Sequence, residues 1–398
     1  MTDNLPPGLS TAIGAARQGE IYLNGMMGNQ KPLVPVDSDQ LEASAQRIMS
    51  PEGFAYVAGG AGRELTVAAN RSAFERWQIV PRMLNNVAER DGAIELFERT
   101  LRAPLLLAPI GVQELAHKEA DLATARAAAA EAVPMIFSNQ ASVAMEETAA
   151  AMGDAPRWFQ LYWGKSNDLV ASLVSRAEKA GCDAIVVTLD TTLLGWRTRD
   201  LDFAYLPFLE AKGIAQYTSD PVFRAMLEKT PEEDPGAAAL AFMGVYSNPA
   251  LTWDDLSFLR DHTSLPILLK GINHKDDALK ALDYGVDGLL VSNHGGRQVD
   301  GARGALDGLA EIALAVGDQA PIVFDSGIRS GADMFKALAL GASAVCLGRP
   351  YIYGLALAGE DGVRAVIQNL LADFDLTMGL AGCRSVDEIT RDALVEVG

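Results

Sequence analysis

The sequence predicts an α/β fold of the (β/α)8 barrel class, with an N-terminal helical extension and a long insertion after the fourth strand. From about residue 104 onward, eight short apolar segments alternate with longer Ala-, Leu- and Glu-rich segments. Eight such alternations are typical of a parallel barrel. A doubly wound sheet is the alternative, but its glycine-rich phosphate turn would follow the first strand, whereas here glycine and arginine follow the last two.

The predicted strands are short continuous apolar runs, which is the pattern of parallel strands buried on both faces. They lie at 105–108, 135–137, 158–161, 184–189, 266–270, 287–291, 321–324 and 343–347. Helical patterns between them occupy 120–131, 168–179, 276–284 and 332–340.

Two segments fall outside this repeat, although we expect one domain over residues 1–398. Residues 1–100 form the extension, with helical patterns at 39–48 and 64–71, and the barrel is expected over 101–380. Residues 193–252 lie between the fourth and fifth strands. Connections this long usually act as lids or binding loops, so we expect a mobile lid there and not a membrane anchor.

Composition excludes several classes of function. The net charge of −19 argues against nucleic-acid binding, which needs clustered Lys and Arg. An anionic substrate would then be held by a few local arginines. Cys182, Cys346 and Cys383 lie far apart on apolar segments, so we expect buried thiols of a reduced, cytoplasmic compartment and no metal site. Residues 1–10 lack the pattern of a signal peptide, and no apolar run is long enough to predict a membrane span.

Polar side chains follow the predicted strands at their carboxyl ends, where barrel enzymes carry their reactive groups. After the sixth strand comes Ser292-Asn293-His294-Gly295-Gly296-Arg297. A titratable imidazole and a fixed cation, separated by flexible backbone, suit removal of a proton from an anionic substrate. The chain has only four histidines, so few other residues could serve as this base. Asp190, after the fourth strand, is interpreted as the carboxylate that orients His294.

The ends of the last two strands predict a phosphate site. Gly327-Ile328-Arg329 and Gly348-Arg349 supply backbone N–H groups and guanidiniums, as barrel phosphate sites do. A phosphate-bearing cofactor is therefore expected. Lys270, after the fifth strand, would face the ring end of that cofactor. Alternatively Lys270 is the Schiff-base lysine of a flavin-free aldolase, but that alternative does not explain a pair of His294 and Asp190.

From about Glu20 to its C-terminus the chain resembles the FMN-dependent L-2-hydroxy acid oxidases. The signature is Ser292-Asn293-His294-Gly295-Gly296-Arg297-Gln298, supported by Tyr56-Val57-Ala58-Gly59-Gly60, Pro81-Arg82-Met83-Leu84, Phe159-Gln160-Leu161-Tyr162 and Phe335-Lys336-Ala337-Leu338-Ala339-Leu340-Gly341-Ala342. The resemblance implies FMN as cofactor, a small 2-hydroxy acid and dioxygen as reactants, and a homotetramer or homo-octamer.

The resemblance also implies catalytic roles. His294 would take the proton of the substrate hydroxyl while the α-hydrogen leaves as hydride, and Asp190 would stabilise the imidazolium. Tyr162 would hydrogen-bond the same hydroxyl, and Lys270 would stabilise the reduced flavin. A non-catalytic FMN-binding protein is an alternative from another functional class.

Substrate and cofactor contacts are implied in the same way. The substrate carboxylate would be held by Tyr56, Arg197 and Arg297. The residues implied to contact FMN, besides Lys270, are Pro109, Ile110, Gly111, Ser138, Gln160, Thr188, Ser292, Asp325, Gly327, Arg329, Gly348 and Arg349.

Two features are similar to the lactate 2-monooxygenase branch of this family. Trp196 stands where many plain oxidases carry a charged residue, and Gly111 stands where many relatives carry Ala. The missing methyl at 111 would leave room beside the flavin; alternatively, Gly111 only lets the backbone turn. The implied reaction is oxidation of L-lactate or a similar short acid, which gives acetate, carbon dioxide and water. If the keto acid leaves first, the products are the keto acid and hydrogen peroxide.

Overall fold

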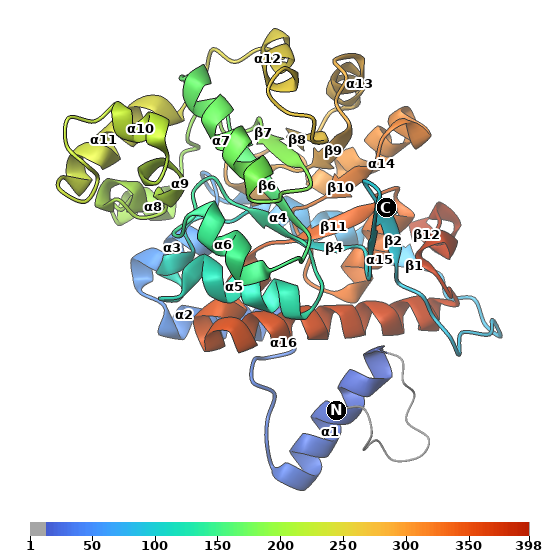
Figure 1. The fold of residues 1–398 in the computed structure, drawn as a ribbon. Helices are drawn as coiled ribbons and strands as arrows, with labels where there is room; N and C mark the ends of the chain where they lie inside the picture. Colours follow the sequence, from blue (N-terminus) through green and yellow to red (C-terminus); the bar gives the residue numbers. More distant parts are fainter. Residues whose placement is uncertain (1–12, 398) are drawn as a thin grey trace.

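The centre of the protein is a closed barrel of eight parallel strands (Figure 1). The computed structural model describes residues 13–397. The strands are β4 (Leu105–Leu107), β5 (Met135–Phe137), β6 (Arg157–Tyr162), β7 (Ile185–Thr188), β8 (Ile267–Ile272), β9 (Gly288–Val291), β10 (Ile322–Phe324) and β11 (Ala344–Leu347). They pair in chain order, and β11 closes the barrel against β4. The predicted barrel is confirmed, and every strand overlaps a predicted segment.

Helices surround this barrel, and those predicted between the strands are confirmed. They are α5 (Ala120–Ala130), α6 (Met145–Met152), α7 (Asn167–Lys179), α12 (Leu256–Arg260), α13 (Lys275–Asp283), α14 (Ala305–Val316), α15 (Gly331–Ala339) and α16 (Arg349–Ala381). Helix α15 begins at a capping box, in which the side chains of Ser330 and Asp333 each accept the other's backbone N–H. Helix α16 has Pro350 in its first turn and ends at Gly382, whose φ of 91° favours glycine.

The N-terminal extension is helical, as predicted. It contains α1 (Ile13–Gly28), α2 (Ser38–Ile48), α3 (Pro51–Ala58) and α4 (Leu65–Glu75). Helices α1 and α2 pack on α16 at the bottom of Figure 1. The patterns at 39–48 and 64–71 correspond to α2 and α4. Helix α3 was not predicted because six of its eight residues are buried. Its sequence therefore lacks the alternation of polar and apolar residues by which an amphipathic helix is predicted.

Two pairs of short strands outside the barrel were not predicted. The hairpin of β2 (Ile94–Leu96) and β3 (Arg99–Leu101) leads into β4 and covers the N-terminal end of the barrel. Leu96 and Leu101 join the interior core with Trp158. Strands β1 (Trp77–Ile79) and β12 (Leu394–Glu396) pair antiparallel and bring distant parts of the chain together. Three-residue strands are too short for their alternation to be read from sequence.

The segment 193–252 is folded around an aromatic core of its own. It contains α8 (Thr198–Asp202), α9 (Ala215–Thr218), α10 (Pro221–Ala225) and α11 (Pro235–Tyr246), seen beside α7 in Figure 1. Phe242 is fully buried and meets Tyr217 edge to face, with ring centroids 4.8 Å apart. The predicted lid is therefore built from packed helices, and its mobility stays a prediction.

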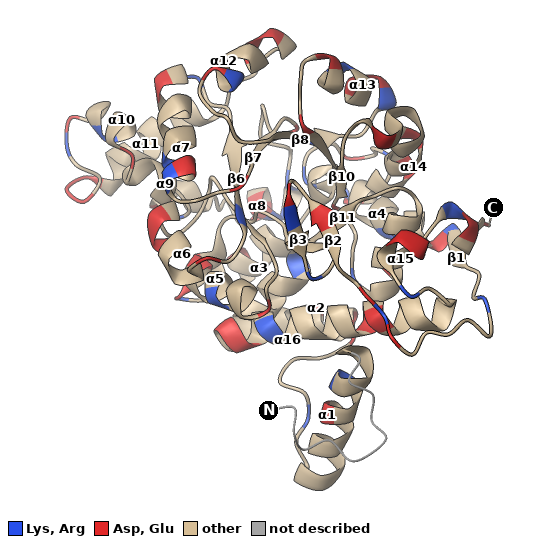
Figure 2. Ribbon diagram, turned by 45° about the vertical axis from the view of Figure 1, so that its right-hand side comes forward, with Lys and Arg blue, Asp and Glu red and all other residues tan. Residues whose placement is uncertain are grey.

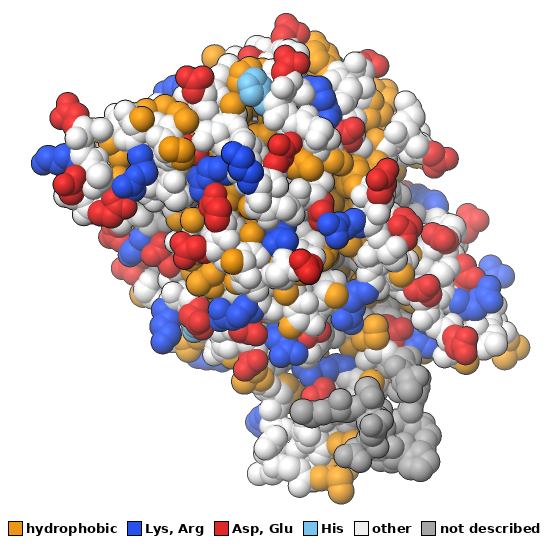
Figure 3. Space-filling model, viewed as in Figure 1, with side chains coloured by type: hydrophobic (Ala, Val, Ile, Leu, Met, Phe, Trp, Pro, Cys, Tyr) orange, Lys and Arg blue, Asp and Glu red, His pale blue; other side chains and the backbone are white. Residues whose placement is uncertain are grey.

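Charged residues lie mostly on the outer helices and loops (Figure 2), and both signs are interspersed over the face seen in Figure 3. All three cysteines are free and buried, as expected. Between residues 13 and 397 no helix is both long and apolar enough to cross a lipid bilayer. Residues 1–10, for which no signal peptide is predicted, lie outside the described residues.

We expect the Leu101→Ala substitution to lower the free energy of unfolding by about 2–4 kcal/mol, because it leaves a cavity between the β2–β3 hairpin and the barrel interior. Denaturant unfolding of the purified variant measures this loss. Leu314→Ala is the matched control, since the Leu314 side chain is 87% exposed. Equal stability of the two variants would contradict this account of the hairpin.

Candidate active site

One cavity opens at the carboxyl ends of the barrel strands, and all eight strand ends contribute to its wall. Its volume is about 990 Å³, counting the open space at its mouth. The predicted site residues that line it are Tyr56, Pro109, Ile110, Gly111, Ser138, Gln160, Tyr162, Thr188, Arg197, Lys270, His294, Arg297, Asp325, Gly327, Arg329, Gly348 and Arg349. Asp190 and Ser292 do not line it and lie behind His294 and Lys270.

His294, the predicted base, is hydrogen-bonded to the predicted orienting carboxylate. Its Nδ1 lies 2.7 Å from Asp190 Oδ1, and Thr191 Oγ1 donates to the same carboxylate oxygen at 3.0 Å. Because the carboxylate can only accept, we assign the proton to Nδ1. Nε2 then carries the lone pair, and it lies 3.5 Å from the hydroxyl of Tyr162. This arrangement can accept a proton from a ligand in the cavity.

Burial and neighbouring charges keep the two partners in the states that proton transfer needs. Burial lowers the pKa of His294, and Lys270 and Arg197 lower it further, against the opposing effect of Asp190. Burial alone would raise the pKa of Asp190, but His294 and Lys270 outweigh it, so this pKa is lowered. Near neutral pH the imidazole is therefore neutral and the carboxylate ionised.

The backbone at His294 is held in an uncommon conformation. Its φ of 58° is in the left-handed region, where a non-glycine residue costs about 1–3 kcal/mol. Three hydrogen bonds stabilise the loop: the N–H of His294 donates to Ser292 Oγ at 3.0 Å, that of Gly295 to Ser326 Oγ at 3.0 Å, and that of Gly296 to Asn293 Oδ1 at 3.1 Å. The fully buried Ser292 thus supports the base from behind.

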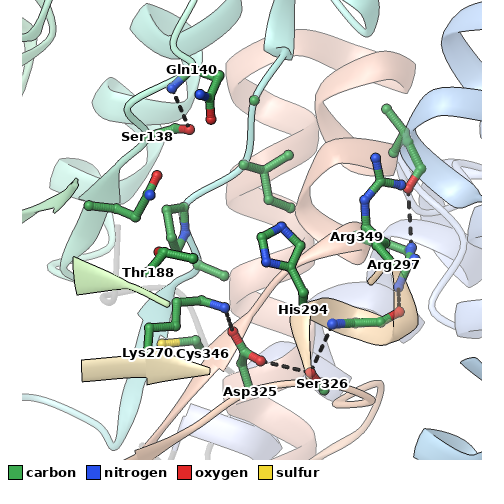
Figure 4. A pocket seen from close by; sticks show the side chains of 18 of the residues that line it. Ser138, Gln140, Thr188, Lys270, His294, Arg297, Asp325, Ser326, Cys346 and Arg349 are labelled. Carbon is green, nitrogen blue, oxygen red and sulfur yellow. Dashed lines mark hydrogen bonds and ion pairs between the residues drawn. The ribbon is translucent and has the colours of Figure 1, made fainter. Parts of the chain in front are cut away.

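Lys270 is a buried cation in a chain of polar contacts. Its Nζ lies 3.0 Å from Asp325 Oδ2, which in turn belongs to a carboxylate that accepts from Ser326 (Figure 4). Nζ also donates to Ser292 Oγ at 2.8 Å. Burial acts to lower the pKa of Lys270, but Asp325 and Asp190 outweigh burial, and the pKa is raised. A Schiff-base lysine must be neutral to attack a carbonyl. The charged state of Lys270 therefore disfavours the aldolase alternative.

Two arginines meet at the side of the cavity formed by α3. Arg297 donates to the carbonyls of Tyr56 at 2.6 Å and Gly59 at 2.8 Å, and its guanidinium lies 5.1 Å from the centre of the Tyr56 ring. Arg197 donates through Nε to the carbonyl of Arg297 at 3.3 Å. Burial lowers the pKa of Arg297 to about 9, and Arg197 and Arg349 act in the same direction. Buried cations so close together favour a bound anion.

A second pair of arginines lies at the predicted phosphate end. Arg349 donates to the carbonyls of Val57, Gly59 and Gly295 at 3.0–3.1 Å, and it stands in the first turn of α16. Burial lowers the pKa of Arg329, and Arg349 lowers it further. Two guanidiniums beside a helix N-terminus form a site for a phosphate group.

Unpartnered polar atoms mark the part of the cavity where a polar ring fits. Gln140 Nε2, Gln160 Nε2 and Thr188 Oγ1 are buried and have no hydrogen-bond partner among residues 13–397. A buried polar group costs about 1–3 kcal/mol when it is left unsatisfied. All three residues line the cavity, so a planar ligand with donors and acceptors on its edge would satisfy them. These residues fit the isoalloxazine of FMN, as the phosphate end fits its phosphate.

Several lining residues were not among those individually predicted to contact substrate or cofactor. They are Val57, Ala108, Gln140, Leu194, Phe208, Tyr246, Gly295, Ser326, Ile328 and Cys346. Phe208 and Tyr246 come from the segment 193–252, and the Tyr246 ring meets that of Tyr162 edge to face at 5.5 Å. No local pattern distinguishes these two aromatic residues from others in the segment. Gln140 and Ser326, by contrast, lie a few residues after the ends of β5 and β10 and could have been found by extending the rule of strand ends.

Gly111 packs tightly against the chain at residue 140. A Cβ added to Gly111 would collide with the carbonyl oxygen of Gln140 and lie 2.6 Å from its Cβ. Such an approach requires glycine. The geometry thus supports the backbone explanation of Gly111 over the explanation that a missing methyl opens space for ligand and oxygen.

Comparison with known proteins agrees with this geometry. Residues 45–396 match the FMN-dependent dehydrogenase family. The chain belongs to this family. It is therefore an FMN-dependent oxidoreductase built on a (β/α)8 barrel.

The relatives are similar over almost their whole length. An FMN-dependent alpha-hydroxy acid dehydrogenase of Penicillium citrinum is 45% identical over 95% of this chain and 94% of its own. An L-lactate oxidase of Lysinibacillus sphaericus is 43% identical over 95% of this chain and 97% of its own. A solved structure of mandelate oxidase is 40% identical and covers 92% of this chain and 99% of its own, with a TM-score of 0.81.

We expect the rate of flavin reduction to rise with pH through an ionisation below 6.5, the ordinary pKa of histidine, because the pKa of His294 is lowered. Asp190→Asn should shift this ionisation to still lower pH, since the Asp190 carboxylate raises that pKa, and should also slow the maximal rate. Anaerobic stopped-flow reduction across the acidic range measures both effects. Asp318→Asn, on the surface, should change neither. An upward shift in Asp190→Asn would contradict the assignment.

We expect Gly111→Ala to weaken FMN binding by about 5- to 100-fold, because the added methyl displaces residue 140 from the cavity wall. Quenching of FMN fluorescence on titration with the apoprotein measures the affinity. Gly244→Ala is the control, since a Cβ there meets nothing within 4 Å. Unchanged affinity in Gly111→Ala would mean that position 111 faces open space.

Proposed function

We propose that this enzyme oxidises L-lactate or a similarly short L-2-hydroxy acid to the 2-keto acid, with dioxygen as electron acceptor. One observation carries the proposal: a proton acceptor, His294, faces the same cavity as the guanidiniums of Arg197 and Arg297 and the FMN site. A base beside fixed cations suits a hydroxy carboxylate. Relatives named L-lactate oxidase and 4-hydroxymandelate oxidase support this substrate class.

The substrate is held at its carboxylate and at its hydroxyl. Arg197 and Arg297 bind the carboxylate, assisted by the hydroxyl of Tyr56. Tyr162 hydrogen-bonds the substrate hydroxyl and directs it toward His294 Nε2, which lies 3.5 Å from the hydroxyl of Tyr162. The carboxylate neutralises part of the buried positive charge, and charge-assisted hydrogen bonds of this kind are strong.

When bound, FMN supplies the acceptor for the α-hydrogen, which leaves as hydride. His294 takes the hydroxyl proton at Nε2 and becomes an imidazolium. Asp190 stabilises that charge through the hydrogen bond to Nδ1, which is already 2.7 Å long. Lys270 stays protonated and keeps a positive charge on its side of the cavity. Burial of these groups strengthens each electrostatic contact by excluding water.

The aromatic wall favours a short substrate side chain. The Tyr246 ring meets that of Tyr162, and the Tyr56 ring meets that of Phe208 edge to face at 6.4 Å. Phe208 and Tyr246 are themselves in contact at 6.1 Å. Because these rings already pack against one another, they support the proposal of a methyl or ethyl group over a phenyl group on the substrate.

The same chemistry has a second outcome, that of lactate 2-monooxygenase. If pyruvate stays bound, the peroxide formed beside it decarboxylates it, so that lactate and dioxygen give acetate, carbon dioxide and water. The observation that favours this outcome is the contribution of Leu194, Phe208 and Tyr246, all from the segment 193–252, to the cavity wall. A packed wall of this kind slows product release.

The proposal is tested by anaerobic mixing of the yellow enzyme with L-lactate, L-2-hydroxybutyrate, L-mandelate and D-lactate. The flavin should be bleached fastest by L-lactate or L-2-hydroxybutyrate. Lack of bleaching by any 2-hydroxy acid would overturn the proposal. Product analysis under air then separates the two outcomes: pyruvate with equal peroxide indicates the oxidase, and acetate with carbon dioxide indicates the monooxygenase.

We expect His294→Gln to bind FMN normally and to lose about 10²- to 10⁴-fold in the rate of flavin reduction by L-lactate, since the base is removed. Stopped-flow absorbance measures the rate, and fluorescence titration measures FMN affinity. His262→Gln is the matched control because His262 lies exposed. Reduction at the wild-type rate in His294→Gln would exclude His294 as the base.

A further inference from the structure

Gln298 lies outside the cavity wall, yet its side-chain amide uses all of its hydrogen-bonding groups next to the site. Nε2 donates to the carbonyls of Asp190 and Leu193, each at 2.8 Å. Oε1 accepts from Arg197 Nη2 at 3.0 Å and from the backbone N–H of Gly195 at 3.4 Å. Most surface glutamines bond water, so four protein partners are unusual for a half-buried side chain.

The orientation of this amide is fixed by its partners. If the amide were turned over, its NH2 group would face the N–H groups of Arg197 and Gly195, and its oxygen would face two carbonyls. All four contacts would then be repulsive. Only one orientation of Gln298 therefore satisfies the site.

Gln298 contacts three parts of the site that have different proposed roles. Asp190 is the partner of His294, Leu193 and Gly195 begin the segment 193–252, and Arg197 is a predicted substrate arginine. The backbone segments at Gly195 and Gln298 are also in close contact, because a Cβ on Gly195 would lie 2.8 Å from the carbonyl oxygen of Gln298. Apart from Gln298, Arg197 donates only to the carbonyl of Arg297 among the hydrogen bonds of residues 13–397.

We propose that Gln298 is a positioning residue that holds Arg197 in register with the pair of Asp190 and His294. This inference rests on the proposed function, because it assumes that Arg197 binds a carboxylate. A guanidinium held in place before binding loses less freedom when the anion arrives. Without Gln298, Arg197 keeps its bond to the carbonyl of Arg297 but loses the bond at Nη2. The substrate must then order that end of the guanidinium, so binding should weaken more than turnover.

Two variants test this role in the FMN-loaded enzyme. Gln298→Met keeps the approximate size and removes all four hydrogen bonds. We expect the Kd for oxalate, read from the change in flavin absorbance, and the KM for L-lactate to rise roughly 10- to 100-fold. The kcat should change much less, and FMN affinity should stay the same. Gln319→Met is the control, since Gln319 is exposed and bonds only its neighbouring turn.

Gln298→Glu adds a second readout, the pH dependence of oxalate affinity, which a purely structural role of Gln298 would leave unchanged. The ionised carboxylate still accepts from Arg197 but repels the carbonyls of Asp190 and Leu193, and it competes with a substrate anion for Arg197. Oxalate affinity relative to wild type should therefore be lowest at neutral pH. It should recover as the pH falls and the new carboxyl becomes neutral, since a protonated carboxyl again has one donor and one acceptor.

The outcomes separate the two proposals. Oxalate Kd and KM within twofold of wild type in Gln298→Met would overturn the positioning role, even if the melting temperature falls. A wild-type enzyme that no 2-hydroxy acid bleaches would overturn the proposed function. If no 2-hydroxy acid bleaches the enzyme but Gln298→Met still binds oxalate more weakly than wild type, the positioning role of Gln298 holds and only the proposed function is wrong.

Discussion

Buried positive charge is the constraint on which the rest of the site depends. The cavity wall carries Lys270 and four arginines, within a chain whose net charge is −19. Burying charged groups is unfavourable unless each is paired or hydrogen-bonded. Only Asp325 among the lining residues is a carboxylate, with Asp190 and Asp200 close behind. The cations therefore need anionic ligands, and the phosphate of FMN and the carboxylate of the proposed substrate would supply them.

Backbone carbonyls hold these cations in place until ligands arrive. The C-terminal end of α3 presents the carbonyls of Tyr56, Val57 and Gly59, and the carbonyl of Gly59 accepts from both Arg297 and Arg349. The negative end of a helix dipole favours cations at this position. One helix end thus orients an arginine of the proposed substrate site and an arginine of the proposed phosphate site together. It explains why the N-terminal extension is part of the active site although it lies outside the barrel.

Much of the candidate site could be predicted because a closed parallel barrel brings every strand end to one rim. Knowing where the strands end, one can infer that His294, Lys270 and Arg349 converge. The same rule cannot find Phe208 or Tyr246, since neither follows a strand and each reaches the cavity through packing within the segment 193–252. Gln298 shows a different limit of sequence analysis. It is evident as part of the motif, but its four hydrogen-bond partners lie at residues 190–197, which come next to it only in the folded protein.

The sequence by itself determined the barrel, the end of the barrel that carries the chemistry and the residue types available there, because strand periodicity and strand-end position are local properties. Only the tertiary structure decided the charge on Lys270, since that depends on burial and on Asp325, which follows β10 on the far side of β9. It also decided that Gly111 faces Gln140 and that the β2–β3 hairpin covers the opposite end of the barrel. These properties arise from contacts between residues far apart in the chain, and local sequence patterns do not predict such contacts.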